Sequence, residues 1–228
     1  MVILMSFYLY HILNKNTGHI YIGRTQNSNQ WDMHQYFLQT NQHFSRLMQK
    51  HYNNQDDFEF KIIEQSEDPV YIAKQAIHLI EEIDSMNPMQ GYNSFFDSQG
   101  IGKRGAKIEL YDEDILFYFL THNKSETLKK FDISSNVFDY RIQRQGFGQT
   151  DERIPVSTYE CLYYFCAQEA VLSPTPISAS SLMDRCFRLY DVSRRLRPTP
   201  HKISKNLKAL NIPQIKKNGL IYFTTNDN

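Results

Sequence analysis

Side chains that can transfer protons recur in order through the first 97 residues of the chain. They are two tyrosines, two histidines and an asparagine: Tyr10, Tyr21, His34, His43 and Asn93. A phenol or an imidazole held at a reacting group can serve as a general acid, a general base or a nucleophile. A tyrosine has an ordinary pKa near 10, so it acts as a base at pH 7 only where a cation or a metal-bound water lies beside it. The pattern therefore favours acid–base chemistry that depends on neighbouring positive charge.

The elements expected around these side chains form a small α+β domain. Residues 7–23 place aromatic and β-branched residues on either side of an Asn/Thr/Gly turn, which predicts a β-hairpin. Residues 30–53 have helical spacing, and residues 58–63 predict a third strand. A further helix with one apolar face is expected to open at Asp68-Pro69. The order β-β-α-β-α predicts a three-stranded antiparallel sheet flanked by helices.

Short motifs and their spacing show which family this domain resembles. Tyr8-Leu9-Tyr10 comes first, Tyr21 follows Tyr10 by eleven residues, and the later matches are Tyr21-Ile22-Gly23, Trp31-x-x-His34, His43 and Gly91-Tyr92-Asn93. Over residues 7–93 this series resembles the GIY-YIG nuclease superfamily, most closely its phage-type homing endonucleases. Tyr8 stands where the family has glycine. A chance aromatic hairpin would not account for the later matches.

The resemblance implies hydrolysis of a phosphodiester in double-stranded DNA, with Mg²⁺ or Mn²⁺ in an active form. By the same resemblance, Tyr10 activates water or attacks as a phenolate, and Tyr21 orients that group. His34 assists from one helical turn beyond the family's arginine. His43 matches a position that the phage members use, and Asn93 closes the domain.

Two charged groups of the family pattern are absent from this chain. Gln30 occupies the position of the family's arginine, and an amide cannot offset the charge of a pentavalent phosphate. Ala76 occupies the position of the glutamate that is the family's metal ligand. Gln75 is adjacent, but it points about 100° round the helix. Because losing one such electrostatic group costs about 10²–10³ in rate, we expect the chain as written to be catalytically impaired and its metal ligand to be absent.

The two departures leave alternatives open. One is the decay of a nuclease into a DNA-binding regulator that occludes or represses a site, and the other is deliberate inactivation of an enzyme. Arg24 is the best candidate for a stand-in cation, and the alternative is a surface residue that follows a strand. Glu81 and Glu82 lie more than a helical turn beyond Ala76 and are expected to face solvent, which makes them weak candidates for binding a metal.

The remainder of the chain is predicted to be mainly helical and to bind DNA. Glycines mark residues 98–107 as a linker between a nuclease-like domain over residues 1–97 and a helix-turn-helix-like region over residues 108–172. Helical spacing covers residues 112–120, 125–131 and 134–144. The candidate DNA-contacting residues of this region are Asn136, Tyr140, Gln143 and Arg144. Two ordinary packed helices would give the same pattern.

Residues 173–228 resemble a winged-helix domain. Helices are expected over residues 181–190 and 201–210, followed by a hairpin over residues 214–223 that turns at Asn218-Gly219. The candidate phosphate-binding residues are Arg194, Arg195, Lys202, Lys205, Lys208, Lys216 and Lys217. The alternative is a basic helical domain that binds protein.

Composition and charge limit the classes of protein to which the chain can belong. The 228 residues carry no net charge, but residues 1–97 hold six Lys/Arg against eleven Asp/Glu, and residues 178–228 hold ten against three. This asymmetry suggests that the second half holds the polyanion. With 41% hydrophobic residues the chain is not wholly disordered, and it has no apolar run of membrane-spanning length and no signal-peptide pattern. Three cysteines without a CxxC motif predict reduced thiols in a cytoplasmic protein. The resemblance to phage-type homing endonucleases implies a phage or its bacterial host, and the sequence makes no prediction of oligomeric state.

Overall fold

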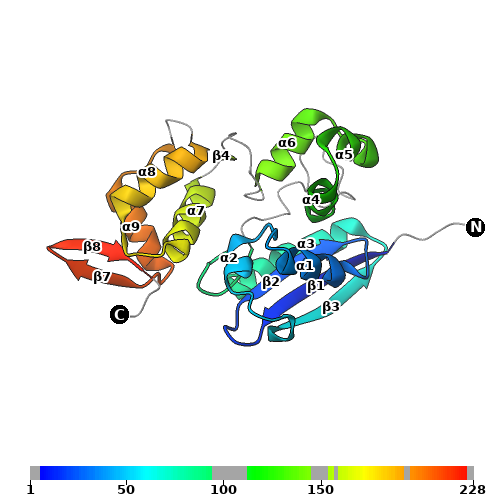
Figure 1. The fold of residues 1–228 in the computed structure, drawn as a ribbon, viewed down its shortest axis with the longest axis horizontal. Helices are drawn as coiled ribbons and strands as arrows, with labels where there is room; N and C mark the ends of the chain where they lie inside the picture. The colour runs from blue at the N-terminus through cyan, green and yellow to red at the C-terminus, as the bar shows by residue number, and fades with distance from the viewer. Residues whose placement is uncertain (1–5, 94–111, 145–153, 157–158, 193–195, 225–228) are drawn as a thin grey trace, which may run out of the picture.

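The computed structural model describes residues 6–93, 112–144, 154–156, 159–192 and 196–224 (Figure 1). The linker predicted over residues 98–107 lies outside these ranges. In the parts of the chain that are described, no helix is both long enough and apolar enough to cross a membrane.

The first described part is the expected α+β domain. Strands β1 (Phe7–Asn14), β2 (Ile20–Thr25) and β3 (Phe58–Ser66) form an antiparallel sheet in the order β2-β1-β3. The helices are α1 (Gln30–Gln39), α2 (Arg46–Lys50), the short 3₁₀ helix η1 (Gln55–Asp57) and α3 (Pro69–Ile83). The fold class predicted from the sequence is confirmed.

The two faces of this sheet bury separate apolar clusters. Tyr10 and Ile12 of β1 share a cluster with Phe37 and Leu38 of α1. Leu9 of β1 belongs instead to the cluster that α3 covers. This division follows from the pleat, because successive side chains of a strand point to opposite faces. The helices α1 and α3 therefore lie on opposite sides of β1, and Tyr10 faces α1.

The hairpin depends on a glycine opposite Tyr10. Tyr10 pairs with Gly23 across the β1–β2 ladder, and a Cβ atom built on Gly23 would lie 2.2 Å from Tyr10 Cζ. The phenol ring therefore occupies the space that a side chain at position 23 would need. The turn of the hairpin is set separately by Asn14, whose Oδ1 accepts hydrogen bonds from the N–H groups of Asn16 and Thr17.

The three helices predicted in the middle of the chain are present as α4 (Asp112–Thr121), α5 (Lys124–Phe131) and α6 (Ser135–Arg144). In α6, Phe138 is buried and its ring lies 5.0 Å from that of Phe119. Asp139 forms an ion pair with Lys124 at 2.5 Å.

The last part of the chain is built around a helix that the sequence pattern did not reveal. This helix, α7 (Tyr159–Leu172), packs on α8 (Ala179–Leu189) and α9 (Pro200–Ala209). The short strand β4 (Ile154–Val156) pairs in parallel with β6 (Tyr190–Val192). A second sheet, in the order β5-β8-β7, contains β5 (Ile177–Ser178), β7 (Gln214–Lys217) and β8 (Leu220–Phe223).

Local chemistry explains the ends of these elements. Ser178 Oγ accepts from the N–H of Ser181 at the start of α8, as expected for its cap. Asn218 and Gly219 both have positive φ, which is the geometry of a two-residue hairpin turn. Cys166 and Cys186 are buried free thiols whose Sγ atoms lie 3.3 Å apart.

Replacing Gly23 with Ala tests the packing of Tyr10 against β2. The added methyl group overlaps the phenol ring, so we expect a loss of about 1–3 kcal/mol in the free energy of unfolding. Thermal and urea denaturation measure this loss. Gly18→Asn is the matched control, because Gly18 has open space around it and asparagine tolerates its φ of +74°. Equal stability of the two variants would contradict the close approach of Tyr10 to β2.

Candidate active site

The structure brings three of the predicted site residues into direct contact. Tyr10 of β1, Tyr21 of β2 and His34 of α1 are all buried, and Tyr10 Oη lies 2.8 Å from His34 Nε2. The ring centroid of Tyr21 lies 6.3 Å from that of Tyr10 and 5.6 Å from that of His34. Strand pairing and the α1 helix thus place side chains that are distant in sequence around one phenol group.

A fourth predicted residue extends this contact into a chain of hydrogen bonds. His34 Nδ1 lies 2.8 Å from His43 Nε2, and His43 Nδ1 accepts from the backbone N–H of Ser45 at 3.0 Å. His43 was expected within a helix, but it lies in the loop before α2, because Ser45 is the N-cap of that helix. The loop conformation is what turns the His43 ring toward His34.

The backbone N–H of Ser45 fixes the direction of the hydrogen bonds that link His43, His34 and Tyr10. Because a backbone N–H only donates, Nδ1 of a neutral His43 is an acceptor and its Nε2 carries the proton. His43 Nε2 then donates to His34 Nδ1, which leaves the His34 proton on Nε2, facing Tyr10 Oη. In this arrangement His34 donates to the tyrosine oxygen rather than accepting its proton. Ser45 was not predicted from the sequence, because its part is played by its backbone N–H.

Burial keeps both imidazoles neutral. Burial lowers the pKa of His34 to about 3. It also lowers the pKa of His43 well below the ordinary value, with a smaller contribution from the neighbouring His34. Both rings are therefore uncharged at pH 7, as the hydrogen-bond direction requires. They can orient and stabilise a tyrosine oxygen, but they do not supply the positive charge that the chemistry demands.

Asn93 lies beside this cluster as part of the backbone framework. Its Oδ1 accepts from the N–H of Ile22 at 2.9 Å, and its Nδ2 donates to the Ile22 carbonyl at 2.8 Å. The side chain therefore pairs with edge strand β2 as a further strand would. This contact fixes the residue that follows Tyr21, which gives Asn93 a positioning role.

Gln30 lies at the first position of α1 and is buried. Thr25 Oγ1 lies 3.2 Å from Gln30 Oε1 and 2.9 Å from Asp114 Oδ1 of α4, and its single proton serves one of them at a time. Gln30 Nε2 has no hydrogen-bond partner among the described residues. A buried donor of this kind is costly unless an acceptor, such as a phosphate oxygen, completes it.

Arg24 is not the surface residue that the alternative interpretation expected. It is 4% exposed, and the register places it opposite Leu9 rather than opposite Tyr10. Since Leu9 belongs to the cluster beneath α3, the Arg24 side chain leaves the sheet on the face away from Tyr10. Its position argues against a role as the stand-in cation at the tyrosine.

The Ala76 position is also separated from the tyrosine cluster. Its methyl group is buried in the apolar cluster that contains Leu9, Ile72 and Ile80. Glu81 and Glu82 are exposed, as expected. No group of three His, Cys, Asp or Glu side chains among the described residues could hold a metal ion. The described donor set therefore does not fit Mg²⁺ or Mn²⁺.

The basic side chains proposed for DNA contact are exposed wherever the structure describes them. Lys202, Lys205 and Lys208 are exposed on α9, while Ile203 and Leu207 of the same helix are buried as expected. The other described candidates, on β7 and α6, are also exposed: Lys216, Lys217 and Asn136. The side chains of Tyr140, Gln143, Arg144, Arg194 and Arg195 lie outside the described residues.

One solved structure is similar to part of this chain. It is the catalytic domain of intron endonuclease I-TevI in a Glu-to-Ala mutant form. The similarity covers 39% of this chain and 93% of that domain, with 27% sequence identity and a TM-score of 0.35. No protein-family model and no curated protein matches the chain. With a TM-score this low, the function has to be argued from the site itself.

The lowered pKa of His34 predicts loss of stability in acid. The unfolded chain takes up a proton at His34 near pH 6.5, whereas the folded chain does so only near pH 3. The stabilisation is therefore complete above about pH 6.5 and is lost as pH falls toward 3. Urea denaturation from pH 7 to pH 4 measures the slope. His34→Gln removes one of the titrating groups and should reduce the slope, while His43 and His51, whose pKa values burial also lowers, keep part of it. Equal slopes in the two proteins would refute the neutral, buried state of His34.

Proposed function

We propose that this chain is a site-directed DNA endonuclease of the GIY-YIG type that is catalytically impaired as written. The observation that carries the proposal is the hydrogen-bonded chain from Ser45 through His43 and His34 to Tyr10. It joins residues picked out by separate motifs into one cluster around a phenol oxygen. A chance aromatic hairpin would give no reason for both histidines to turn toward Tyr10.

The arrangement suits formation of a nucleophilic or basic oxygen at Tyr10. A hydrogen bond donated by His34 Nε2 stabilises a developing negative charge on Tyr10 Oη. Gln30 Nε2 is a buried donor at the start of α1 without a hydrogen-bond partner among the described residues, and in this proposal it would receive a phosphate oxygen. An amide supplies less stabilisation than a guanidinium, because it carries no charge. The proposed defect is therefore electrostatic, while the aromatic and imidazole framework persists.

The second part of the chain supplies the proposed DNA grip. Its exposed lysines project from α9 and from the β7–β8 wing, while the apolar residues of α9 face inward. Lysines on a helix and a wing neutralise phosphates without reading bases. Double-stranded DNA is the proposed partner, and cleavage would occur at a distance from the duplex segment that α9 and the wing bind.

A nuclease-dead regulator is the second candidate function. It is favoured by the neutral Gln30 and by the apolar surroundings of Ala76, which together leave the described site without a cation or a metal ligand. Such a protein would bind the same DNA and block access to it. The two candidates share the DNA-binding surface and differ only in chemistry.

Restoring the missing charges separates the two candidates. A sequence bound by the full chain is first selected from random duplexes and then placed in a plasmid. With Mg²⁺ or Mn²⁺, the variant carrying Gln30→Arg and Ala76→Glu should cleave this plasmid at least about 10²-fold faster than the chain as written. Gln30→Arg should supply this gain, because position 76 lies in the apolar cluster on the face of the sheet away from Tyr10. Adding Tyr10→Phe to the double variant should abolish the gain.

Folding controls this experiment, because Ala76→Glu puts a carboxylate into an apolar cluster. Thermal melting establishes whether the double variant folds, and Gln30→Arg alone is the second test if it does not. A folded double variant that binds its selected target but stays inert on it would reject the endonuclease and leave the regulator.

Replacing the exposed lysines of α9 tests the DNA-binding surface. If Lys202, Lys205 and Lys208 contact phosphates, changing all three to Gln should reduce the slope of log K against log salt by about 2–3. Fluorescence anisotropy with a labelled duplex measures this slope. The matched control changes three exposed lysines of the first domain to Gln: Lys15, Lys61 and Lys74. An unchanged slope in the α9 variant would exclude α9 from the DNA contact.

A further inference from the structure

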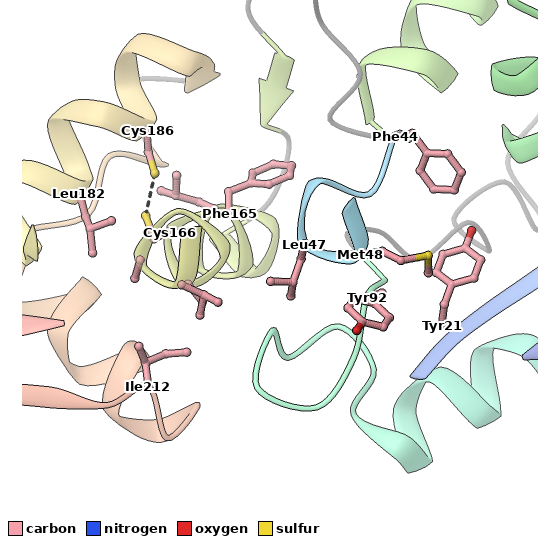
Figure 2. Close-up of a cluster of buried hydrophobic side chains, with 14 of the residues drawn as sticks. Tyr21, Phe44, Leu47, Met48, Tyr92, Phe165, Cys166, Leu182, Cys186 and Ile212 are labelled. Carbon is pink, nitrogen blue, oxygen red and sulfur yellow. Dashed lines mark hydrogen bonds between the residues drawn. The ribbon is translucent and has the colours of Figure 1, made fainter. Parts of the chain in front are cut away.

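Helix α7 packs between two parts of the molecule, which are the first domain (residues 6–93) and the rest of the C-terminal part (residues 154–224). Its residues Leu162, Phe165, Cys166, Ala170 and Val171 are all buried, although they do not share one face of the helix. A helix that is apolar all round is covered on more than one side. Figure 2 shows the two neighbours that cover it, with Cys166 directed toward Cys186 of α8 and Leu47 of α2 lying against α7.

The contact between α7 and the first domain is apolar at its centre. Leu47, Met86 and Tyr92 of the first domain line one small hollow together with Tyr164 and Gln168 of α7. The buried side chains of the two parts form one continuous cluster that runs from Tyr10 to Phe223. The first domain and the C-terminal part therefore share a core, which a flexible tether alone would not produce.

A buried carboxylate sits at this junction. Glu169 of α7 is fully buried, and its Oε1 lies 2.6 Å from an Nη atom of Arg46 on α2. Arg185 of α8 approaches from the other side, with its Nε 3.0 Å from Oε2, in a geometry that makes an ion pair without a hydrogen bond. One negative charge is thus shared between an arginine of each part.

Two further contacts fix the orientation of the junction. Lys50 Nζ donates to the Val171 carbonyl at 2.7 Å, near the C-terminal end of α7, where carbonyl groups lack helical partners and a cation is favoured. Asn87 Nδ2 donates to the Leu210 carbonyl at 3.3 Å, just beyond α9. The docked arrangement is therefore tied at three polar points in addition to its apolar centre.

Glu169 restricts the geometry in which the two parts dock more than it stabilises their contact. Arg46 is half exposed, so its attraction to the carboxylate is screened by water. A buried charge nevertheless tolerates few arrangements, because losing one partner leaves it desolvated and uncompensated. Glu169 thus selects one docking geometry of the two parts.

We propose that the α7 junction holds the Tyr10 site and the α9 surface in one fixed body, with Glu169 and Arg46 as the pair that sets the spacing between the duplex segment that α9 binds and the phosphodiester at Tyr10. This inference rests on the proposed function, since it assigns the geometry of the DNA that the chain would take. The substrate class is a single continuous duplex in which the two positions lie at one separation.

The docking is tested by measuring distances in the full chain. Spin labels attached through non-canonical amino acids at Lys74 and Ser180, both exposed, avoid the native thiols. Double electron–electron resonance should give one narrow distribution of the distance between the two labels. Arg46→Met removes a partner of Glu169 and favours an opened state in which water reaches the carboxylate, so the distribution should broaden at least about twofold. Arg188→Met, at an exposed arginine of α8, is the control and should leave the width unchanged.

A spacing series tests the role on DNA. Duplexes carry the selected sequence at graded distances from a fixed cleavable region, and the chain carries the charge-restoring changes at positions 30 and 76. Cleavage should peak at one spacing and spread over several when Arg46→Met is added. Broad distances in a chain that still binds DNA would overturn the docking alone. Narrow distances in a chain that binds no duplex would overturn the spacing role together with the proposed function.

Discussion

The hydrogen bond donated by the Ser45 backbone to His43 is the constraint on which the candidate site depends. A backbone amide has no second protonation state, so it sets the tautomer of His43, and His43 sets that of His34. The N-cap residue of a five-residue helix therefore determines that the His34 proton lies on Nε2, where it faces Tyr10 Oη. The cap is held in place in turn, because Ser45 Oγ also donates to the Tyr92 carbonyl at 3.1 Å.

Burial strengthens the hydrogen bonds from Ser45 to Tyr10, but it also limits the chemistry that these side chains can perform. Excluding water makes each hydrogen bond stronger and keeps the imidazoles neutral. The same exclusion makes any negative charge on Tyr10 or on a phosphate expensive unless a cation accompanies it. Gln30 and Ala76 leave that cation and the metal ligand out of the described site. Under the proposed function, the framework is retained while the charges that the reaction would need are missing.

Sequence patterns predicted those elements whose apolar residues repeat on one face. The hairpin, α3, α9 and the wing were all recovered. The helix α7 was missed because its apolar residues surround it, so no single face stands out from the sequence. Contacts such as Arg46 with Glu169 join residues 123 apart and leave no local signal. The wrong alternative for Arg24 has the same cause, because its burial is imposed by α3 and the sheet rather than by its neighbours in sequence.

The difference in charge between the first and last parts of the chain is a second reason why a fixed junction would matter for the proposed DNA binding. The first 97 residues carry an excess of acidic groups, so by themselves they are repelled by a phosphate backbone, whereas the last 51 residues attract it. Under the proposed function, a site on the acidic part would reach DNA only if the basic part carried it there and held it at a high local concentration. A loose tether would let the repulsion push the site away from the duplex. A docked α7 opposes that displacement, since moving the acidic part outward would break up the shared apolar core and expose Glu169 on one side.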